Sequence, residues 1–303
     1  MNVVSVKNSD AKKRVVALGF FDGVHIGHGA LLGECCTVAE RLGYIPSVLT
    51  YSRHPSEIVG TCPVKLINTT AERKELISAL YGIEDIIVKD FTKEYASLSC
   101  EEFFEKILLG ELKAGYAVAG YDFRFGRAGA GDAKVLVELC ERFGVGCRII
   151  DEVRVGDAAV SSSRIRACIA CGDMESAAQL LGHPHCIISE ILHGKNLGEK
   201  LGFPTANQRI EPNIQLPKFG VYHSRIIIGN RKYKGITNIG LRPTVENFAL
   251  PCAETHILDF SGNVYGKMAK LELISFLRDE IKFDSEESLR KQIAEDVKTA
   301  RLF

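Results

Sequence analysis

The 303-residue sequence lacks an excess of charge of either sign, because 38 Lys and Arg residues balance 38 Asp and Glu residues. A chain without net charge has no global field that draws it to nucleic acid or to an anionic membrane, so any phosphate it binds must be held locally. The sequence also lacks a hydrophobic run of the roughly 18 residues that a membrane-spanning helix needs. It contains no internal repeat and no low-complexity segment.

An apolar leader is absent as well, since the basic residues 12–14 precede the first apolar segment. We therefore expect no signal peptide and a cytoplasmic protein whose ten cysteines are reduced thiols. Cys168 and Cys171 form a CxxC motif, but no second pair of Cys or His residues stands at metal-binding spacing, so a structural zinc site is not expected. Cys35 and Cys140 fit buried helix positions.

The first part of the chain alternates apolar strands with amphipathic helices. Strands are expected at residues 14–18, 45–51, 85–88, 116–120 and 147–153, and a helical stretch at 164–181. Capping boxes that begin at Thr69 and Ser99 mark two helix starts. Such alternation predicts parallel strands joined by crossover helices, and hence a doubly wound α/β domain.

The sequence pattern changes after Gly182, His183 and Pro184. Strand-like residues 221–228 and 232–239 flank the two-residue turn signal at 229–230, and residues 253–260 and 264–276 flank a similar turn. These hairpins predict a small antiparallel β-barrel or sandwich, closed by a C-terminal helix with Leu289, Ile293 and Val297 on one face. A chain of this length has room for two domains at roughly 150 residues each, and we place them at residues 1–183 and 184–303.

Residues 19–28, with the sequence GFFDGVHIGH, lie between the first expected strand and the first expected helix. Open parallel sheets bind ligands at this junction, where the start of the helix offers N–H groups to a phosphate. His25 and His28 can donate hydrogen bonds to one oxyanion, because Gly27 lets the backbone come close. Nucleotidyl transfer needs such donors but no strong base, since its attacking phosphate is already anionic. Two surface histidines at a helix start are the alternative interpretation.

Two further segments of this half lie at the ends of expected elements. Residues 161–166 (SSSRIR) place hydroxyls, backbone amides and two guanidinium groups at a helix start, which suits a triphosphate or pyrophosphate. An N-cap serine followed by solvated arginines is the alternative. Residues 120–126 (GYDFRFG) carry aromatic rings that can stack on a flat ring, although Phe at a strand end is more often part of the core.

The second half contains an unusual loop at residues 198–207 (GEKLGFPTAN). Thr205 and Asn207 offer oxygen ligands to a hard cation such as Mg²⁺, although a structural turn with a hydrogen-bonding Thr/Asn pair is the alternative. Phosphoryl transfer to a neutral alcohol also needs a carboxylate that accepts the proton of the hydroxyl. Glu254 lies in a strand-like segment where it can point into a barrel, although a Glu that faces solvent is the commoner outcome.

In their order and spacing, residues 19–28, 120–126 and 161–166 resemble the adenylyltransferase module of the bacterial bifunctional riboflavin kinase/FMN adenylyltransferases, also called FAD synthetases. The resemblance implies that His25 and His28 stabilise the α-phosphate of ATP during attack by FMN. It implies ATP or phosphate contacts for Gly19, Phe20, Asp22, Gly23, Ser162, Ser163, Arg164 and Arg166. It implies flavin contacts for Tyr51, His54, Asp122 and Phe125. Arg53 stands where this family usually has a proline.

Residues 198–207, 238–244, 254–260, 265–266 and 277–283 resemble the riboflavin kinase module of the same family. The resemblance implies that Gly198, Thr205 and Asn207 bind ATP, with Thr205 and Asn207 at Mg²⁺. It makes Glu254 the base on the ribityl hydroxyl and places Arg278 near the flavin. Glu199 stands where the family commonly has Arg, and Lys195 or Lys200 can supply the missing phosphate contact.

The expected function is therefore ATP-dependent phosphorylation of riboflavin to FMN in the barrel domain, followed by adenylylation of FMN to FAD in the α/β domain with release of pyrophosphate. Two alternatives are a nucleotidyltransferase that acts on pantetheine or nicotinate phosphates, and a non-enzymatic barrel that binds flavin or RNA. The kinase-like second half argues against the first. A neutral chain without a run of basic and aromatic residues argues against RNA binding.

Overall fold

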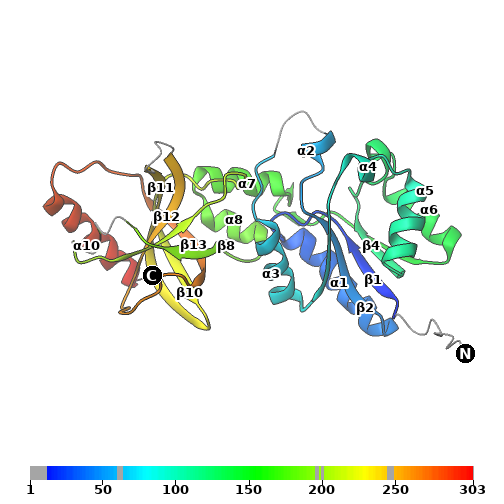
Figure 1. The fold of residues 1–303 in the computed structure, drawn as a ribbon, viewed down its shortest axis with the longest axis horizontal. Helices are drawn as coiled ribbons and strands as arrows, with labels where there is room; N and C mark the ends of the chain where they lie inside the picture. The colour runs from blue at the N-terminus through cyan, green and yellow to red at the C-terminus, as the bar shows by residue number, and fades with distance from the viewer. Residues whose placement is uncertain (1–11, 60–63, 195–197, 199–200, 244–248, 303) are drawn as a thin grey trace, which may run out of the picture. The chain divides into compact units, whose positions relative to one another are not determined.

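The computed structural model in Figure 1 describes residues 12–59, 64–194, 198, 201–243 and 249–302. Glu199, Lys195 and Lys200, which were considered above as phosphate contacts, lie outside the described residues. The chain divides into two compact units: the residues up to Val64 with Lys74–Ala159, and Lys65–Arg73 with Val160–Phe303. This division falls at Ala159, whereas the sequence pattern changes near residue 183.

The first unit contains a five-stranded parallel sheet with the strand order β3-β2-β1-β4-β5, so the predicted doubly wound α/β fold is confirmed. Its strands are β1 (Arg14–Leu18), β2 (Ile45–Tyr51), β3 (Asp85–Lys89), β4 (Ala114–Gly120) and β5 (Gly146–Ile150). Its helical segments are α1 (Ile26–Leu42), α2 (Ser56–Val59), most of α3 (Thr70–Tyr81), α4 (Lys93–Ala96), α5 (Cys100–Glu102), η1 (Phe103–Glu111), η2 (Arg127–Gly129) and α6 (Ala133–Phe143). A short sheet pairs β6 (Arg154–Val155) with β7 (Ala158–Ala159).

Apolar side chains cover both faces of the parallel sheet, as a sheet between two helical layers requires. Phe104 of η1 and Leu136 of α6 belong to the same core cluster as Leu18 of β1. On the other face, the thiol of Cys35 in α1 donates a hydrogen bond to the carbonyl oxygen of Val15, over 3.2 Å. Because all five strands are parallel, their carboxyl ends meet at one edge, which is the edge where such sheets bind ligands.

The second unit contains a closed antiparallel barrel with the strand order β10-β11-β12-β9-β8-β13, which confirms the predicted barrel rather than a sandwich. Its strands are β8 (His185–Leu192), β9 (Thr205–Arg209), β10 (Gly220–Ile228), β11 (Arg231–Pro243), β12 (Ala249–Ile257) and β13 (Met268–Arg278). Helices α7 (Ser162–Cys171) and α8 (Met174–Leu181) precede the barrel, and α10 (Glu286–Leu302) follows it.

Successive residues of the barrel strands face opposite sides of the wall, because side chains alternate along a strand. Ile236 of β11 packs outward in a cluster with Ala300 of α10. Its neighbour Thr237 is fully buried inside the barrel, where its hydroxyl lies 2.8 Å from the hydroxyls of both Ser224 and Thr255. The outer face of this wall, beneath α10, is therefore a second surface on which functional side chains can gather.

Several details of the fold differ from the sequence-based expectations; for example, β13 begins at Met268 rather than at residue 264. The helical stretch predicted at residues 164–181 is two helices, because Gly172 ends α7 in the left-handed conformation at φ 87°. Strand β5 ends at Ile150 rather than at residue 153, and β12 ends at Ile257 rather than at residue 260.

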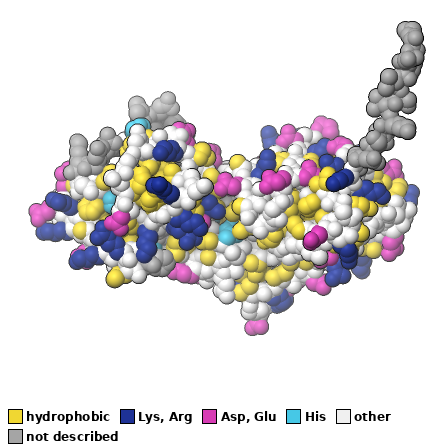
Figure 2. All heavy atoms as spheres, turned by 90° about the horizontal axis from the view of Figure 1, so that it is seen from below, with side chains coloured by type: hydrophobic (Ala, Val, Ile, Leu, Met, Phe, Trp, Pro, Cys, Tyr) yellow, Lys and Arg dark blue, Asp and Glu magenta, His cyan; other side chains and the backbone are white. Residues whose placement is uncertain are grey.

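Several expectations about composition can be compared with the described residues. The nine described cysteines are free, and Cys35 and Cys140 are buried as predicted. None of the described helices is long and apolar enough to cross a membrane. Basic and acidic side chains both appear over each unit on the face that Figure 2 shows.

Candidate active sites

The loop between β1 and α1 brings the two predicted histidines together at the start of α1. His25 is the N-cap residue, and its Nδ1 accepts a hydrogen bond from the backbone N–H of His28 over 3.2 Å. The two imidazole rings stack with their centroids 3.5 Å apart. A Cβ atom at Gly27 would lie 3.1 Å from the His25 ring, so a glycine keeps that ring in place. The pair thus lies at the positive end of the helix dipole, which favours an anion.

Backbone strain is concentrated in the residues that lead into His25. Phe21 and Val24 have positive φ angles of 60° and 45°, which side chains with a Cβ rarely adopt. Such conformations cost on the order of 1–3 kcal/mol each, and they persist only where the surroundings enforce them. Both side chains are fully buried, and the N–H of Val24 donates to the carbonyl oxygen of Phe21 over 3.1 Å. Gly23, between them, has a φ of 86° that a glycine adopts without this cost.

Burial sets the charge of His25, and its hydrogen bond with the backbone N–H of His28 sets its tautomer. Desolvation lowers the pKa of its imidazole from 6.5 to about 4, so the ring is neutral at pH 7. A neutral imidazole carries one proton, and Nδ1 of His25 already acts as a hydrogen-bond acceptor. The proton therefore resides on Nε2, which makes Nε2–H a neutral hydrogen-bond donor for a ligand.

Other predicted residues of this loop connect it to β2 and to the segment that follows β2. The N–H of Gly19 donates to the carbonyl oxygen of Leu49 over 3.3 Å, which joins the loop to β2. The ring of Phe20 meets the ring of His54 edge to face, with centroids 4.7 Å apart, and Asp22 is buried. Arg53, which replaces the usual proline, is exposed. The structure thus brings His54 beside the β1–α1 loop.

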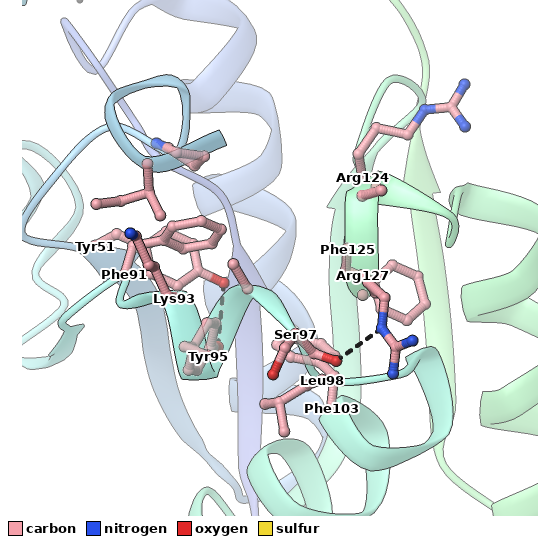
Figure 3. Close-up of a pocket in the computed structure, with 16 residues that line it drawn as sticks. Tyr51, Phe91, Lys93, Tyr95, Ser97, Leu98, Phe103, Arg124, Phe125 and Arg127 are labelled. Carbon is pink, nitrogen blue, oxygen red and sulfur yellow. Dashed lines mark hydrogen bonds between the residues drawn. The ribbon is translucent and has the colours of Figure 1, made fainter. Parts of the chain in front are cut away.

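A cavity of about 690 Å³ opens at the carboxyl ends of the parallel strands, and we call it the aromatic cavity (Figure 3). Tyr51 and Phe125, which were predicted to contact flavin, both line it, whereas His54 and Asp122 do not. The hydroxyls of Tyr51 and Tyr95 lie 3.3 Å apart, and burial raises the pKa of Tyr51 to about 12. The aromatic cavity is further lined by Tyr95, Pro55, Ile58, Phe91, Lys93, Ala96, Ser97, Leu98, Phe103, Arg124, Gly126, Arg127, Ala128 and Gly129.

The predicted phosphate-binding segment at residues 161–166 forms the start of α7, which belongs to the second unit. Ser161 is the N-cap, and its hydroxyl accepts the N–H of Arg164 over 3.3 Å. Ser162 and Ser163 are the first two residues of the helix, and the guanidinium of Arg166 donates to the Ser163 hydroxyl over 3.0 Å. The N-cap serine that was the alternative interpretation of this segment is therefore present, and phosphate binding stays a prediction.

Strand register in the barrel brings the predicted kinase residues together. Strand β9 pairs with β12 so that Thr205 lies opposite His256 and Asn207 lies opposite Glu254. Strand β11 pairs with β12 on its other edge, so that Asn238 also lies opposite Glu254. Since side chains alternate along a strand, these residues share the outer face of the barrel wall beneath α10. Glu254 therefore points neither into the barrel nor into open solvent.

A cavity of about 330 Å³ lies on this outer face, and we call it the barrel-wall cavity. Gly198, Thr205, Glu254 and Arg278, all predicted from the sequence, line it together. Asn207 does not line it: this residue is only 2% exposed, and its Nδ2 donates to the carbonyl oxygen of Thr205 over 3.3 Å. The other lining residues are Leu201, Phe203, Val221, Ile236, Asn238, His256, Glu280, Ile281, Phe283, Leu289, Ile293 and Asp296.

An ion pair with α10 holds the predicted flavin contact Arg278. Nη2 of Arg278 lies 2.6 Å from Oδ2 of Asp296, and its Nε donates to both carboxylate oxygens over 3.1 and 3.2 Å. A third donor, Nη1, reaches the carbonyl oxygen of Asp279 over 3.0 Å. Asp296 is almost fully buried, so the pair is shielded from water. Arg278 is therefore fixed in one position at the edge of the cavity.

Sequence reasoning missed residues in both cavities. Asp296 lies on the same face of α10 as Leu289 and Ile293, and a carboxylate on an otherwise apolar helix face is the signal that identifies it. Phe91 follows the carboxyl end of β3, at the ligand-binding edge of the sheet, and Tyr95 lies one turn further on. The positions of these two aromatic residues relative to the strand ends, rather than any motif, could have revealed them.

Comparisons with known proteins support the assignment of both halves. A family model described as FAD synthetase matches residues 7–164, and one described as riboflavin kinase matches residues 181–303. Proteins named bifunctional riboflavin kinase/FMN adenylyltransferase are similar over nearly the whole chain. The one from Bacillus subtilis (strain 168) is 35% identical, over 97% of this chain and 93% of the relative. The one from Escherichia coli (strain K12) is 31% identical, over 95% and 92%.

The fold is also similar to a crystal structure from Streptococcus pneumoniae that carries the name macrolide-efflux protein. The two chains superpose with a TM-score of 0.84 at 29% sequence identity, over 97% of this chain and 96% of the other. The two-unit architecture is thus shared over the whole length.

The burial of His25 generates a prediction about its protonation. We expect ¹⁵N NMR of the full-length protein to show a neutral His25 with its proton on Nε2 down to about pH 5, because its pKa is about 4. The unfolded chain takes up this proton near pH 6.5, so His25 lowers the free energy of unfolding as the pH falls from about 6.5 to about 4. A titration midpoint of His25 near 6.5 would contradict this account.

Proposed function

Because the chain belongs to the family of bifunctional riboflavin kinase/FMN adenylyltransferases, we propose which of its residues carry each of the two reactions. The enzyme phosphorylates riboflavin to FMN with ATP and adenylylates FMN to FAD. The first reaction belongs to the barrel-wall cavity, and the second to the histidine pair with the aromatic cavity. The observation that carries this assignment is that Gly198, Thr205, Glu254 and Arg278, which are distant in sequence, line one cavity.

In the adenylylation step, a phosphate oxygen of FMN attacks the α-phosphorus of ATP, and pyrophosphate leaves. The attacking group is already anionic, so the site needs charge stabilisation and alignment rather than a base. Nε2–H of His25 supplies a neutral donor at the start of α1, and His28 stacks beside it. In this proposal Gly19, Phe20, Asp22 and Gly23 form the ATP-binding loop. Its strained conformation fixes the direction of His25 before ATP arrives.

The flavin of the adenylylation step occupies the aromatic cavity. A volume of about 690 Å³ is that of a ligand-sized site, and its aromatic walls suit the flat isoalloxazine ring. Tyr51 and Phe125 line it, whereas His54 packs against Phe20. We therefore assign His54 to the loop that binds ATP. Asp122 is exposed and precedes the lining residues 124–129 in the chain, and it stays a predicted flavin contact.

The start of α7 is the proposed site for phosphates of ATP. Its backbone N–H groups and the side chains of Ser162, Ser163, Arg164 and Arg166 suit a polyphosphate chain. The hydrogen bond from Arg166 to the Ser163 hydroxyl, which keeps that guanidinium at the helix start, supports this assignment, whereas the cap formed by Ser161 fits the structural alternative equally well.

In the kinase step, the terminal ribityl hydroxyl of riboflavin attacks the γ-phosphorus of ATP, and ADP leaves. Glu254 accepts the hydroxyl proton as the new bond forms. The register of β9, β11 and β12 supports this role, because it places Glu254 between Asn207 and Asn238. Arg278, held by Asp296, contacts the isoalloxazine ring in this proposal.

Thr205 and Asn207 are the proposed protein ligands of Mg²⁺ in the kinase site. Mg²⁺ at phosphoryl-transfer sites keeps several waters and is bound through one or two carboxylates together with substrate phosphates. The neutral oxygen of Thr205 lines the cavity and would add one ligand beside the phosphates of ATP, whereas Asn207 is buried outside the cavity lining and fits the ion less well. The described residues contain no cluster of three or more His, Cys, Asp or Glu side chains that could hold a metal alone. When bound, the ion would neutralise charge on the phosphates of ATP.

We further propose that the two activities divide near residue 183 and that the enzyme is cytoplasmic. The first family model ends at residue 164 and the second begins at residue 181, which supports a functional boundary in this region. The nine described free cysteines are in keeping with a reducing compartment.

The role of His28 is tested by His28→Ala in the full chain. FAD formation from FMN should fall by on the order of 10²-fold or more, the typical loss for one oxyanion donor, while FMN formation from riboflavin stays normal. Chromatography of both products from one preparation provides an internal control, and Glu40→Ala on the exposed part of α1 is the matched variant. Near-normal FAD synthesis would remove the histidine pair from the mechanism.

The role of Glu254 is tested by Glu254→Gln, which preserves size but cannot accept the proton. FMN production should fall by roughly 10²- to 10⁴-fold, while riboflavin still binds and added FMN is still converted to FAD. Glu190→Gln, an exposed carboxylate on β8, is the control and should retain full activity. If the turnover rate were unchanged and only the KM for riboflavin rose, Glu254 would be a binding residue instead.

A further inference from the structure

The two cavities carry opposite charge, and we propose that this difference sorts the two flavins. On this view the barrel-wall cavity repels FMN, the product formed in it, whereas the aromatic cavity attracts FMN. The inference rests on the proposed function, which assigns riboflavin phosphorylation to the first cavity and adenylylation to the second. Riboflavin is neutral, whereas the phosphate of FMN carries a charge of about −1.5 to −2 at pH 7. Charge is therefore the property that distinguishes this substrate from its product.

Among the charged side chains in the described lining of the barrel-wall cavity, carboxylates outnumber basic residues. Glu254, Glu280 and Asp296 line it, and Arg278 is the only Lys or Arg among its described lining residues. Arg278 and Asp296 form the buried ion pair described above, so their charges cancel. Arg278 thus offers hydrogen bonds and a flat guanidinium face to a neutral ring rather than an unbalanced charge to a phosphate.

The two remaining carboxylates flank one asparagine. Asn238 lies opposite Glu254 in the strand register, and its Nδ2 donates to Oε1 of Glu280 over 3.2 Å. Among the described residues, no Lys, Arg or His forms an ion pair with either carboxylate. Within the described lining, two carboxylates without an ion-pair partner therefore remain in the cavity to which we assign FMN formation.

The aromatic cavity has the opposite character. Lys93, Arg124 and Arg127 line it, and its described lining contains no carboxylate. Arg124 lies 4.0 Å from the carboxylate of Asp132, which is outside the lining, so the positive charge of the cavity comes chiefly from Lys93 and Arg127. In Figure 3, Lys93 and Arg127 come from opposite sides of the cavity, and the guanidinium of Arg124 extends away at its rim. Nε of Arg127 donates to the carbonyl oxygen of Ser97 over 3.1 Å, which fixes the guanidinium at the mouth. This cavity fits an anionic flavin.

Coulomb's law gives the expected effect of one carboxylate on the binding of FMN. One carboxylate about 8 Å from a phosphate of charge about −1.5 to −2, at an effective dielectric constant of about 20, changes binding by roughly 10²- to 10³-fold before screening, and salt reduces this toward tenfold. FMN should consequently be a weak product inhibitor of the kinase reaction. Screening by salt reduces the repulsion, so inhibition by FMN should strengthen as ionic strength rises.

The test measures inhibition of the kinase reaction by added FMN in the full-length enzyme, with radiolabelled riboflavin so that new product is counted separately. Glu280→Gln retains the hydrogen bond with Asn238 but removes one charge, and Asp296→Asn leaves the charge of Arg278 unbalanced. For each variant the ratio of the Ki for FMN to the KM for riboflavin should fall roughly tenfold, with a weaker dependence on salt. Glu287→Gln, an exposed carboxylate of α10 outside the cavity, should leave the ratio unchanged.

The aromatic cavity is tested in the adenylylation reaction with FMN as substrate. Lys93→Gln and Arg127→Gln should each raise the KM for FMN roughly tenfold with a smaller change in kcat, whereas the exposed Arg142→Gln should not. If Asp296→Asn does not fold, Glu280→Gln alone decides the first half of the proposal.

Two results would overturn the proposal. One is an unchanged ratio of Ki to KM in Glu280→Gln, and the other is an unchanged KM for FMN in both Lys93→Gln and Arg127→Gln. Failure of the proposed function is distinguishable, because Glu254→Gln would then form FMN normally. Loss of FMN formation in Glu254→Gln together with an unchanged ratio in Glu280→Gln would refute the charge sorting alone.

Discussion

Strand pairing is the constraint on which both sites of this enzyme depend. In the barrel, the register of β9 on β12 sets Asn207 opposite Glu254 and Thr205 opposite His256. Side chains alternate with a period of two, so a slip of one residue would move Glu254 into the barrel interior, among the buried threonine hydroxyls. In the first unit, five parallel strands bring their carboxyl ends to one edge, where the loop of His25 and the aromatic cavity both lie. The strands that position each site are the same strands that form the sheet and the barrel.

Rigid local devices then orient the side chains that this pairing brings near. Buried Phe21 and Val24 hold a strained loop whose last residue, His25, both caps α1 and offers a donor to a ligand. In the barrel unit, Asp296 of α10 fixes Arg278, which comes from the end of β13. Both devices are buried, so water does not compete for the contacts that orient the functional groups. We infer that the functional side chains are largely pre-organised before substrate binds.

Much of this was predictable from the sequence, because the relevant signals are local. Strand periodicity predicted β1 and β2 with their observed bounds, and the glycine and histidine pattern after β1 predicted that the two histidines lie together at the start of α1. Only some of the residues that line the aromatic cavity were predicted. Tyr51 and Phe125 belong to sequence motifs, whereas Phe91 and Tyr95 line the cavity because β3, which precedes them in the chain, pairs with β2 in the sheet. Whether the outer face that carries Glu254 is covered depends on where α10 packs, which is a long-range contact. The role of Asp296 was missed for the same reason.

The central claim of this account is that one chain binds its two flavin substrates in two different cavities. Crystal structures of the full-length enzyme, one with riboflavin and Mg·ADP and one with FMN, would test it most directly. The account predicts riboflavin in the barrel-wall cavity, with its ribityl hydroxyl next to Glu254, and FMN in the aromatic cavity between Tyr51 and Phe125. Riboflavin and FMN bound in one and the same cavity, with the other empty, would contradict it.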